Sequence, residues 1–169
     1  EMCLSAGRGP CGPRPPLPRR NHQFGWEAED AVTKAREQVA QLIGATAKEV
    51  IWTSGSTESN NLAIKGAADM YRDKGKHIIT AVHEHKATLD PCKRLAKEGF
   101  DVTFLDPGAD GIVTRAVVED AMRDDTILVS LMWAYNEIGT INEIPELGAP
   151  CPERRAVFPT DATPWAGTE

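Results

Sequence analysis

The chain has 169 residues, of which 41% are hydrophobic and 26% are charged, a composition typical of a soluble globular protein with a core of its own. Its formal net charge is -6, and because the first twenty residues are basic, the rest of the chain is more acidic still. This argues against nucleic acid or an anionic membrane as the main partner. No apolar run approaches the roughly 20 residues that a membrane span requires.

The first segment, Glu1–Arg20, differs in kind from the rest of the chain. It holds five Pro, three Gly and four Arg without periodicity, so it lacks the apolar surface that would offset the entropy of ordering. We therefore expect residues 1–20 to be disordered or non-native, and residues 21–169 to form one incomplete domain.

The cysteines and the N-terminus together indicate a compartment. The first twenty residues have no apolar centre of the kind found in secretory signals. The four cysteines show neither a CxxC pair nor a histidine at metal-ligand spacing. This pattern favours reduced thiols in a cytoplasmic location over a disulfide scaffold, and it predicts no metal site.

From residue 21 onward, strand-like and helix-like patterns alternate. Apolar residues at helical spacing predict a helix over 32–42, with Gly44 as its stop. Short apolar runs predict strands at Glu49–Thr53, Lys76–Val82, Asp101–Leu105, Thr126–Met132 and Ala156–Thr160. Further helices are expected from the Ser54–Thr57 turn to about Gly75, at Lys86–Glu98 and at Arg115–Met122. This order predicts an α/β fold, a mostly parallel sheet flanked by helices.

Four polar motifs come directly after predicted strands, at the carboxyl edge where such sheets bind ligands. Ser56 and Thr57, with small neighbours and a helix start behind them, suit a phosphate, although a plain helix cap is the alternative. His85, in a His-Glu-His-Lys run, suits ring stacking or proton transfer, or is simply part of a solvated turn.

The other two motifs are equally ambiguous when taken alone. Asn136 could orient a polar ligand group through its amide, or could belong to an ordinary turn. Asp161 could hold a protonated ring nitrogen, or could cap the next helix. Taken together, the four motifs place phosphate donors, a ring stacker, an orienting amide and a carboxylate along one edge of one sheet.

The sequence resembles the bacterial and mitochondrial cysteine desulfurases, in the class-V aminotransferase group of fold-type-I enzymes that use pyridoxal 5'-phosphate (PLP). The resemblance covers roughly residues 21 to 161. The matching runs are FGWEAEDAV, WTSGSTESNNLAIKGAA, GKHIITAVHEHKATLDPC, EGFDVTFL, DDTILVSLM and NEIGT.

The resemblance implies a role for each motif. Ser56 and Thr57 match the loop that binds the PLP phosphate, and His85 matches the catalytic histidine that stacks on the pyridine ring and assists proton transfer. Asn136 matches the asparagine beside the ring hydroxyl, and Asp161 matches the aspartate that pairs with the ring nitrogen.

The resemblance also implies a reaction and partners. The substrate would be L-cysteine, converted to alanine while its sulfur passes to an enzyme cysteine as a persulfide. The persulfide would supply sulfur to acceptors such as an iron–sulfur scaffold protein, or for tRNA thiolation. Full-length relatives are homodimers with sites at the interface.

The sequence departs from the family pattern in several places. The Schiff-base lysine of a Ser-x-His-Lys run and the persulfide-forming cysteine are not found in these 169 residues. Pro159 and Pro164 stand at positions where His and Gln are usual, and Tyr135 stands where Asn is usual. We therefore expect the chain to be inactive alone. A selenocysteine lyase or another class-V relative, and a non-catalytic fragment, remain the alternatives.

Overall fold

The computed structural model describes residues 3–5, 23–135, 137 and 139–163. The chain forms two compact units, residues 1–54 and 55–169. The domain boundary that composition suggests after residue 20 stays a prediction, because most of the first twenty residues lie outside the described ones.

The first unit holds the long helix α1 (Gln23–Leu42), a 3-10 turn η1 (Ala47–Glu49) and two short strands, β1 (Cys3–Ser5) and β2 (Ile51–Thr53), which pair in parallel. The predicted stop at Gly44 is confirmed, because Gly44 has a φ of 67°, which favours glycine. Inside the segment expected to lack order, β1 is thus a paired strand.

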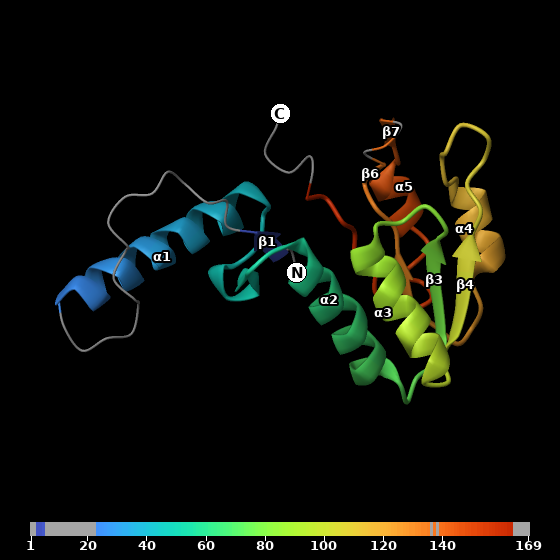
Figure 1. Cartoon of the computed structure of the whole chain (residues 1–169), viewed down its shortest axis with the longest axis horizontal. Helices are drawn as coiled ribbons and strands as arrows, with labels where there is room; N and C mark the ends of the chain where they lie inside the picture. The colour runs from blue at the N-terminus through green and yellow to red at the C-terminus, as the bar shows by residue number, and fades with distance from the viewer. Residues whose placement is uncertain (1–2, 6–22, 136, 138, 164–169) are drawn as a thin grey trace. The chain divides into compact units, whose positions relative to one another are not determined.

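The second unit is built on a parallel sheet with the strand order β4–β3–β5, of which β3 and β4 are labelled in Figure 1. Its strands are β3 (His77–Ala81), β4 (Asp101–Leu105) and β5 (Thr126–Ser130). Helix α2 (Ser56–Tyr71) precedes β3, α3 (Lys86–Lys97) connects β3 to β4, and α4 (Arg115–Ala121) connects β4 to β5. The predicted α/β class, the parallel sheet and these elements are confirmed, with bounds that shift by a few residues.

Helices cover both faces of this sheet, as Figure 1 shows. On one face, Ile78 of β3 packs in a cluster with Ile64 of α2 and Cys92 of α3. On the other face, Ile79 of β3 packs with Val118 of α4 and with the short helix α5 (Ile144–Gly148). Successive side chains of a strand point to opposite faces, so a doubly covered strand is apolar throughout. This explains the continuous apolar runs in the sequence.

The predicted last strand, Ala156–Thr160, is wrong as an extended element. It makes a single parallel bridge, Val157 to Leu128. Val157 N–H donates to Ile127 O, and Val129 N–H donates to Val157 O, both at 2.9 Å. The next donor in this pattern would be residue 159, which is proline and has no N–H, so the ladder ends there.

Between β5 and this bridge the chain forms elements that the sequence pattern did not indicate. Strands β6 (Ala134–Tyr135) and β7 (Thr140–Ile141) pair antiparallel as a small hairpin, and α5 comes next. Two-residue strands are too short to show an alternating pattern, so their pairing rests on tertiary contacts. The hairpin matters because it begins directly after the carboxyl end of β5.

Candidate functional site

The predicted Ser56–Thr57 turn is the start of α2. Gly55 occupies the N-cap position, so neither hydroxyl caps the helix, and the capping alternative is wrong. Ser56 is half-buried and Thr57 is exposed. The N–H groups of a first helical turn lack intrahelical acceptors and carry a partial positive charge. This turn therefore presents donors of the kind that suit a phosphate.

His85 lies after β3 and is the N-cap residue of α3. Its Nδ1 accepts a hydrogen bond from the Ala87 N–H at 3.1 Å, and the residue is exposed. When the imidazole is neutral, an accepting Nδ1 leaves the proton on Nε2. The helix start thus fixes the ring, while its outer nitrogen remains available as a donor.

Asp161 lies four residues beyond the Val157 bridge and is held on both carboxylate oxygens. Oδ2 accepts a hydrogen bond from Asn60 Nδ2 on α2 at 2.8 Å, and Oδ1 accepts from the Thr163 N–H at 3.0 Å and hydroxyl at 2.6 Å. Burial raises the pKa of Asp161, but these hydrogen bonds and the nearby His85 outweigh it, so the net pKa is lowered. The carboxylate is therefore ionised at neutral pH.

Glu84, immediately before His85, is the buried acid of this region. It is 5% exposed, and its Oε1 accepts a hydrogen bond from the Met132 N–H at 2.5 Å. Burial raises the pKa of Glu84 to about 8, and the Asp161 charge adds to this while the Met132 N–H and the Thr88 hydroxyl oppose it. Oε2 makes no hydrogen bond of normal geometry with any described residue. At neutral pH Glu84 is thus largely protonated beside an ionised Asp161.

The segment directly after β5 connects these groups. Trp133 N–H donates to the backbone oxygen of Asp161 at 3.0 Å. The oxygens of Met132 and Trp133 accept hydrogen bonds from the side chain and the backbone N–H of Asn142, at 3.0 and 2.8 Å. Residues 132 and 133 therefore join Glu84 on the β3 side to Asp161 on the tail and to Asn142 after β7.

His83 and Tyr135 form an aromatic pair near the same strand ends. Their ring centroids are 5.0 Å apart at an angle of 75°, and the Tyr135 hydroxyl donates to Glu137 Oε2 at 2.7 Å. Burial lowers the pKa of His83, and neither ring nitrogen has a hydrogen-bond partner among the described residues. Tyr135, which departs from the family pattern, is thus packed against a neutral histidine.

The structure brings together three of the predicted site segments. Asn60 lies three residues after Thr57, on the same side of α2, so its bond to Asp161 brings the start of α2 to that carboxylate. His85 is close enough for its charge to act on Asp161. Asn136 lies outside the described residues, so its predicted role is not tested.

Sequence reasoning missed Asn60 and Glu84. Helical spacing from Thr57 offered a signal for Asn60, because residues three apart share a helix face. No sequence pattern indicated that Glu84 is buried, since it lies in a polar run between two histidines. Only the convergence of two strand ends on this turn encloses its side chain.

Cys92 and Cys151 are poorly suited to act as nucleophiles. Cys92 and Cys151 are free thiols, and both are buried. Burial raises the pKa of Cys92 to about 12 and that of Cys151 to about 11. A thiol attacks as its thiolate, so both side chains are inert core groups at neutral pH.

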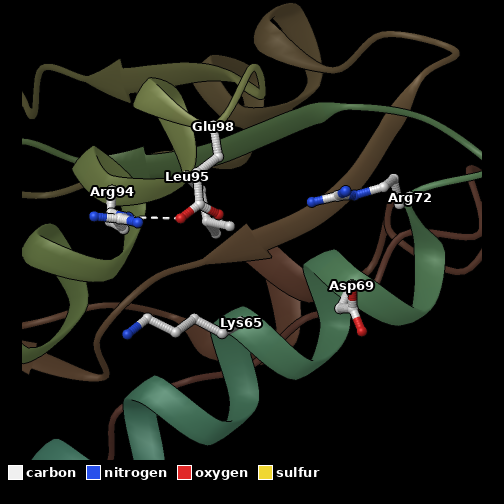
Figure 2. A pocket seen from close by; sticks show the side chains of 6 residues that line it. All are labelled: Lys65, Asp69, Arg72, Arg94, Leu95 and Glu98. Carbon is white, nitrogen blue, oxygen red and sulfur yellow. Dashed lines mark hydrogen bonds and ion pairs between the residues drawn. The ribbon is translucent and has the colours of Figure 1, made fainter.

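A cavity of about 470 Å³ lies elsewhere, between α2 and α3 (Figure 2). Its polar lining is made of three basic and two acidic side chains, and Arg94 pairs with Glu98 at 2.5 Å. The lining residues are Lys65, Asp69, Arg72, Arg94, Leu95 and Glu98. None of them belongs to the predicted site, which lies at the opposite, amino-terminal ends of these helices.

The groups at the strand ends match the chemistry of a phosphorylated aromatic cation. The first turn of α2 offers phosphate donors, the exposed His85 ring offers a stacking surface, and the ionised Asp161 offers an acceptor for a protonated ring nitrogen. Within the described residues, no group of three or more metal-ligating side chains is assembled, and no helix is long and apolar enough to cross a membrane.

Comparison with known proteins gives the same indication. A model of the family described as "Aminotransferase class-V" matches residues 17–167. The chain is 57% identical over 148 residues to the cysteine desulfurase IscS of Pseudomonas aeruginosa and to that of Colwellia psychrerythraea. Each alignment covers 88% of this chain and 37% of the relative, so the chain spans little more than a third of their length.

Solved structures agree with these sequence matches. DndA from Streptomyces lividans superposes with a TM-score of 0.83 at 41% identity, covering 88% of this chain and 42% of that one. The structure described as SspA in complex with cysteine superposes with a TM-score of 0.81 at 40% identity, covering 86% and 42%. The fold of this chain is therefore that of part of the PLP-dependent desulfurases.

Proposed function

From the premise that this chain belongs to the class-V aminotransferase family, we propose that residues 55–163 form most of the PLP-binding site of a cysteine desulfurase. The observation that best supports this proposal is the contact network at the carboxyl edge of the sheet. There Asn60 and Thr163 hold an ionised Asp161 near His85, at the point where α2 begins.

Each group has a distinct role in this proposal. The first turn of α2, with Ser56 and Thr57, binds the phosphate. Asp161 keeps the ring nitrogen protonated, and Asn60 keeps Asp161 ionised and oriented. His85 covers the ring face and holds a proton on Nε2, and Asn136 orients the ring hydroxyl. When bound, PLP supplies an electron sink for the substrate carbanion.

L-Cysteine is the proposed substrate, and alanine and an enzyme persulfide are the proposed products. The names of the IscS relatives and the cysteine-bound SspA structure support this choice. The 169 residues contain no Ser-x-His-Lys run, and the described thiols are buried, so we propose that this chain by itself does not turn over cysteine. A homodimer and a sulfur-accepting protein partner are part of the same proposal.

Titration of the 169-residue chain with PLP, monitored by tryptophan fluorescence, tests the binding step. We expect Asp161→Asn to weaken binding at least tenfold, because it removes a charge-assisted hydrogen bond worth roughly 1.5–3 kcal/mol. Asp106→Asn, which changes an exposed acid after β4, is the matched control and should bind like the unaltered chain. Equal affinities for all three proteins would contradict the proposed site.

A second experiment tests catalysis separately. The chain is incubated with PLP and L-cysteine, alanine is quantified, and borohydride is added to trap any lysine bound to the cofactor. We expect no alanine and no labelled lysine. Alanine formation, or reduction onto a single lysine, would show that the chain is active on its own.

A further inference from the structure

Glu84 occupies a place in the site that the family resemblance did not assign. It ends the turn after β3 and precedes His85, yet its side chain points to the other strand end and accepts the Met132 N–H at 2.5 Å. A glutamate that is only 5% exposed is unusual in a polar run, and its buried carboxyl group requires a compensating interaction. The compensation is this bond to the β5 side.

The bond lies at the centre of the strand-end network. The bond holds Met132, and the next residue is Trp133. The Trp133 N–H donates to the backbone oxygen of Asp161 at 3.0 Å. The Asn142 side chain donates to the oxygen of Met132 at 3.0 Å, which belongs to the next peptide, the one that also carries the Trp133 N–H. We call these residues the Glu84 junction: Glu84, Met132, Trp133, Asn142 and Asp161.

We infer that Glu84 is a positioning residue of this site: its carboxyl group fixes residues 132–133, and through them Asp161, relative to His85. The inference rests on the proposed PLP site and deepens it. His85 and Asp161 come from different segments. Their relative position decides whether His85 can stack on a cofactor ring whose nitrogen is bound by Asp161. The Glu84 carboxyl group joins the segment that carries His85 to residue 132.

The protonation state of Glu84 fits this role. Burial and the Asp161 charge favour the neutral acid, so the proton on Oε2 keeps a second buried anion away from Asp161. Asp161 then remains the single ionised carboxylate of the junction, as a partner for a ring cation must. Glutamine reproduces a neutral Glu84 closely, because it keeps the accepting oxygen and replaces the O–H by an N–H donor.

The test compares Glu84→Gln with Glu84→Leu, by amide hydrogen exchange of the PLP-free chain and by PLP titration. In Glu84→Leu, which lacks the acceptor, we expect exchange at Met132 and Trp133 to rise at least tenfold more than in β3 and β4, and PLP affinity to fall about tenfold. In Glu84→Gln both quantities should stay within about threefold of the unaltered chain. Cys92→Ala, a buried change on α3, is the control and should raise exchange evenly across the sheet.

The outcomes separate this inference from the proposed function. If the unaltered chain does not bind PLP but the local change in exchange occurs, the positioning role stands and the proposed cofactor site fails. If Leu and Gln behave alike, or the Leu variant raises exchange evenly as Cys92→Ala does, the positioning role is refuted. Glu84→Asp, one methylene shorter, serves where the Leu variant does not fold and should match the Leu expectation. Unfolding of both Leu and Asp variants would make Glu84 a requirement of the fold and overturn the inference.

Discussion

The Asn60 amide donates to Asp161 Oδ2 at 2.8 Å, although 101 positions of sequence separate the two residues. Asn60 belongs to the second turn of α2, and Asp161 belongs to the tail beyond the last bridge of the sheet. A single hydrogen bond thus connects the phosphate end of the proposed site to its ring-nitrogen end. Its loss should therefore affect both ends.

Replacing Asn60 by alanine should raise the pKa of Asp161, because one of the hydrogen bonds that stabilise the ionised form is lost. PLP affinity should fall at least tenfold, in line with roughly 1.5–3 kcal/mol for a hydrogen bond to a charged group. Carboxyl carbon NMR measures the pKa, and fluorescence titration measures the affinity. Asn61→Ala, which removes a bond to the Thr57 oxygen on the exposed side of α2, is the control for helix effects. An unchanged Asp161 pKa in Asn60→Ala would contradict the contact.

The stability difference between the chain and Glu84→Gln should depend on pH. The folded pKa of Glu84 is raised to about 8, above the usual value near 4.3 in unfolded chains, so the folded state binds the extra proton between these limits. Stability from this group is therefore fully present below about pH 4.3 and is lost as the pH rises towards 8, by up to roughly 1.4 kcal/mol per pH unit. Urea unfolding at pH 5 and pH 8 measures this loss, which should be absent in Glu84→Gln.

His77 should make the chain less stable in acid. Its Nδ1 is hydrogen-bonded to the Thr126 hydroxyl at 2.7 Å and its Nε2 to the Thr103 hydroxyl at 2.8 Å, and the Thr126 oxygen also accepts the Arg123 N–H. A neutral ring can satisfy both contacts, donating at one nitrogen and accepting at the other, and so joins β3 to β4 and β5. Burial first, and then Arg123, lower its pKa, while Asp125 and Asp101 oppose the shift.

The sign of the effect is set by the lowered pKa of His77. The unfolded chain binds a proton near pH 6.5 that the folded chain takes up only at lower pH, so stability is present above about pH 6.5 and is lost as the pH falls towards the folded pKa. His77→Leu should remove part of this loss of stability at acid pH. It should also lower the free energy of unfolding at pH 7.5 by roughly 1–3 kcal/mol, because the two threonine hydroxyls lose their partner. Denaturation at pH 7.5 and 5.5 measures both effects against the unaltered chain; the residual pH dependence combines His83, whose pKa is also lowered, with Glu84, whose raised pKa acts in the opposite direction.

Cys92 and Cys151 should resist alkylation in the folded chain. A pKa of about 12 for Cys92, against a usual value near 8.5–9, reduces the thiolate fraction by about a thousandfold at neutral pH, and burial restricts access further. Iodoacetamide labelling with peptide mass spectrometry measures the rates at the two positions. In urea both should react at ordinary rates. Rapid labelling of Cys92 in the native chain would show that its thiol is available for chemistry.

Replacing Pro159 by valine should extend the parallel bridge at Val157 into a strand. The new N–H at position 159 can donate to Val129 O, which is the next acceptor in the register set by the Val157 bonds. The added bond, about 1 kcal/mol, is offset by roughly 0.4–1 kcal/mol of unfolded-chain entropy, so stability is a poor readout. Protection of the residue 159 amide from exchange is the measurement, and an unprotected amide would show that something other than proline ends the strand.

The sequence by itself determined the α/β class and the alternation of elements, and it predicted the edge at which we propose the site. Apolar runs such as Thr126–Ser130 reveal strands covered on both faces, and helical periods reveal the crossovers between them. Since parallel strands share one carboxyl edge, the positions of His85 and Asp161 in the chain were enough to assign both to it. The many matching runs of sequence also indicated the family.

Only the tertiary structure decided which of these residues touch and in what state. The Asn60–Asp161 bond, the enclosure of Glu84 and the end of pairing at Pro159 depend on segments that are distant in sequence. Burial is produced by packing and not by residue type, so the same glutamate is ionised in a solvated turn and neutral between two strand ends. A linear pattern gives the period of a single segment, whereas a pKa or a hydrogen bond depends on everything packed around it.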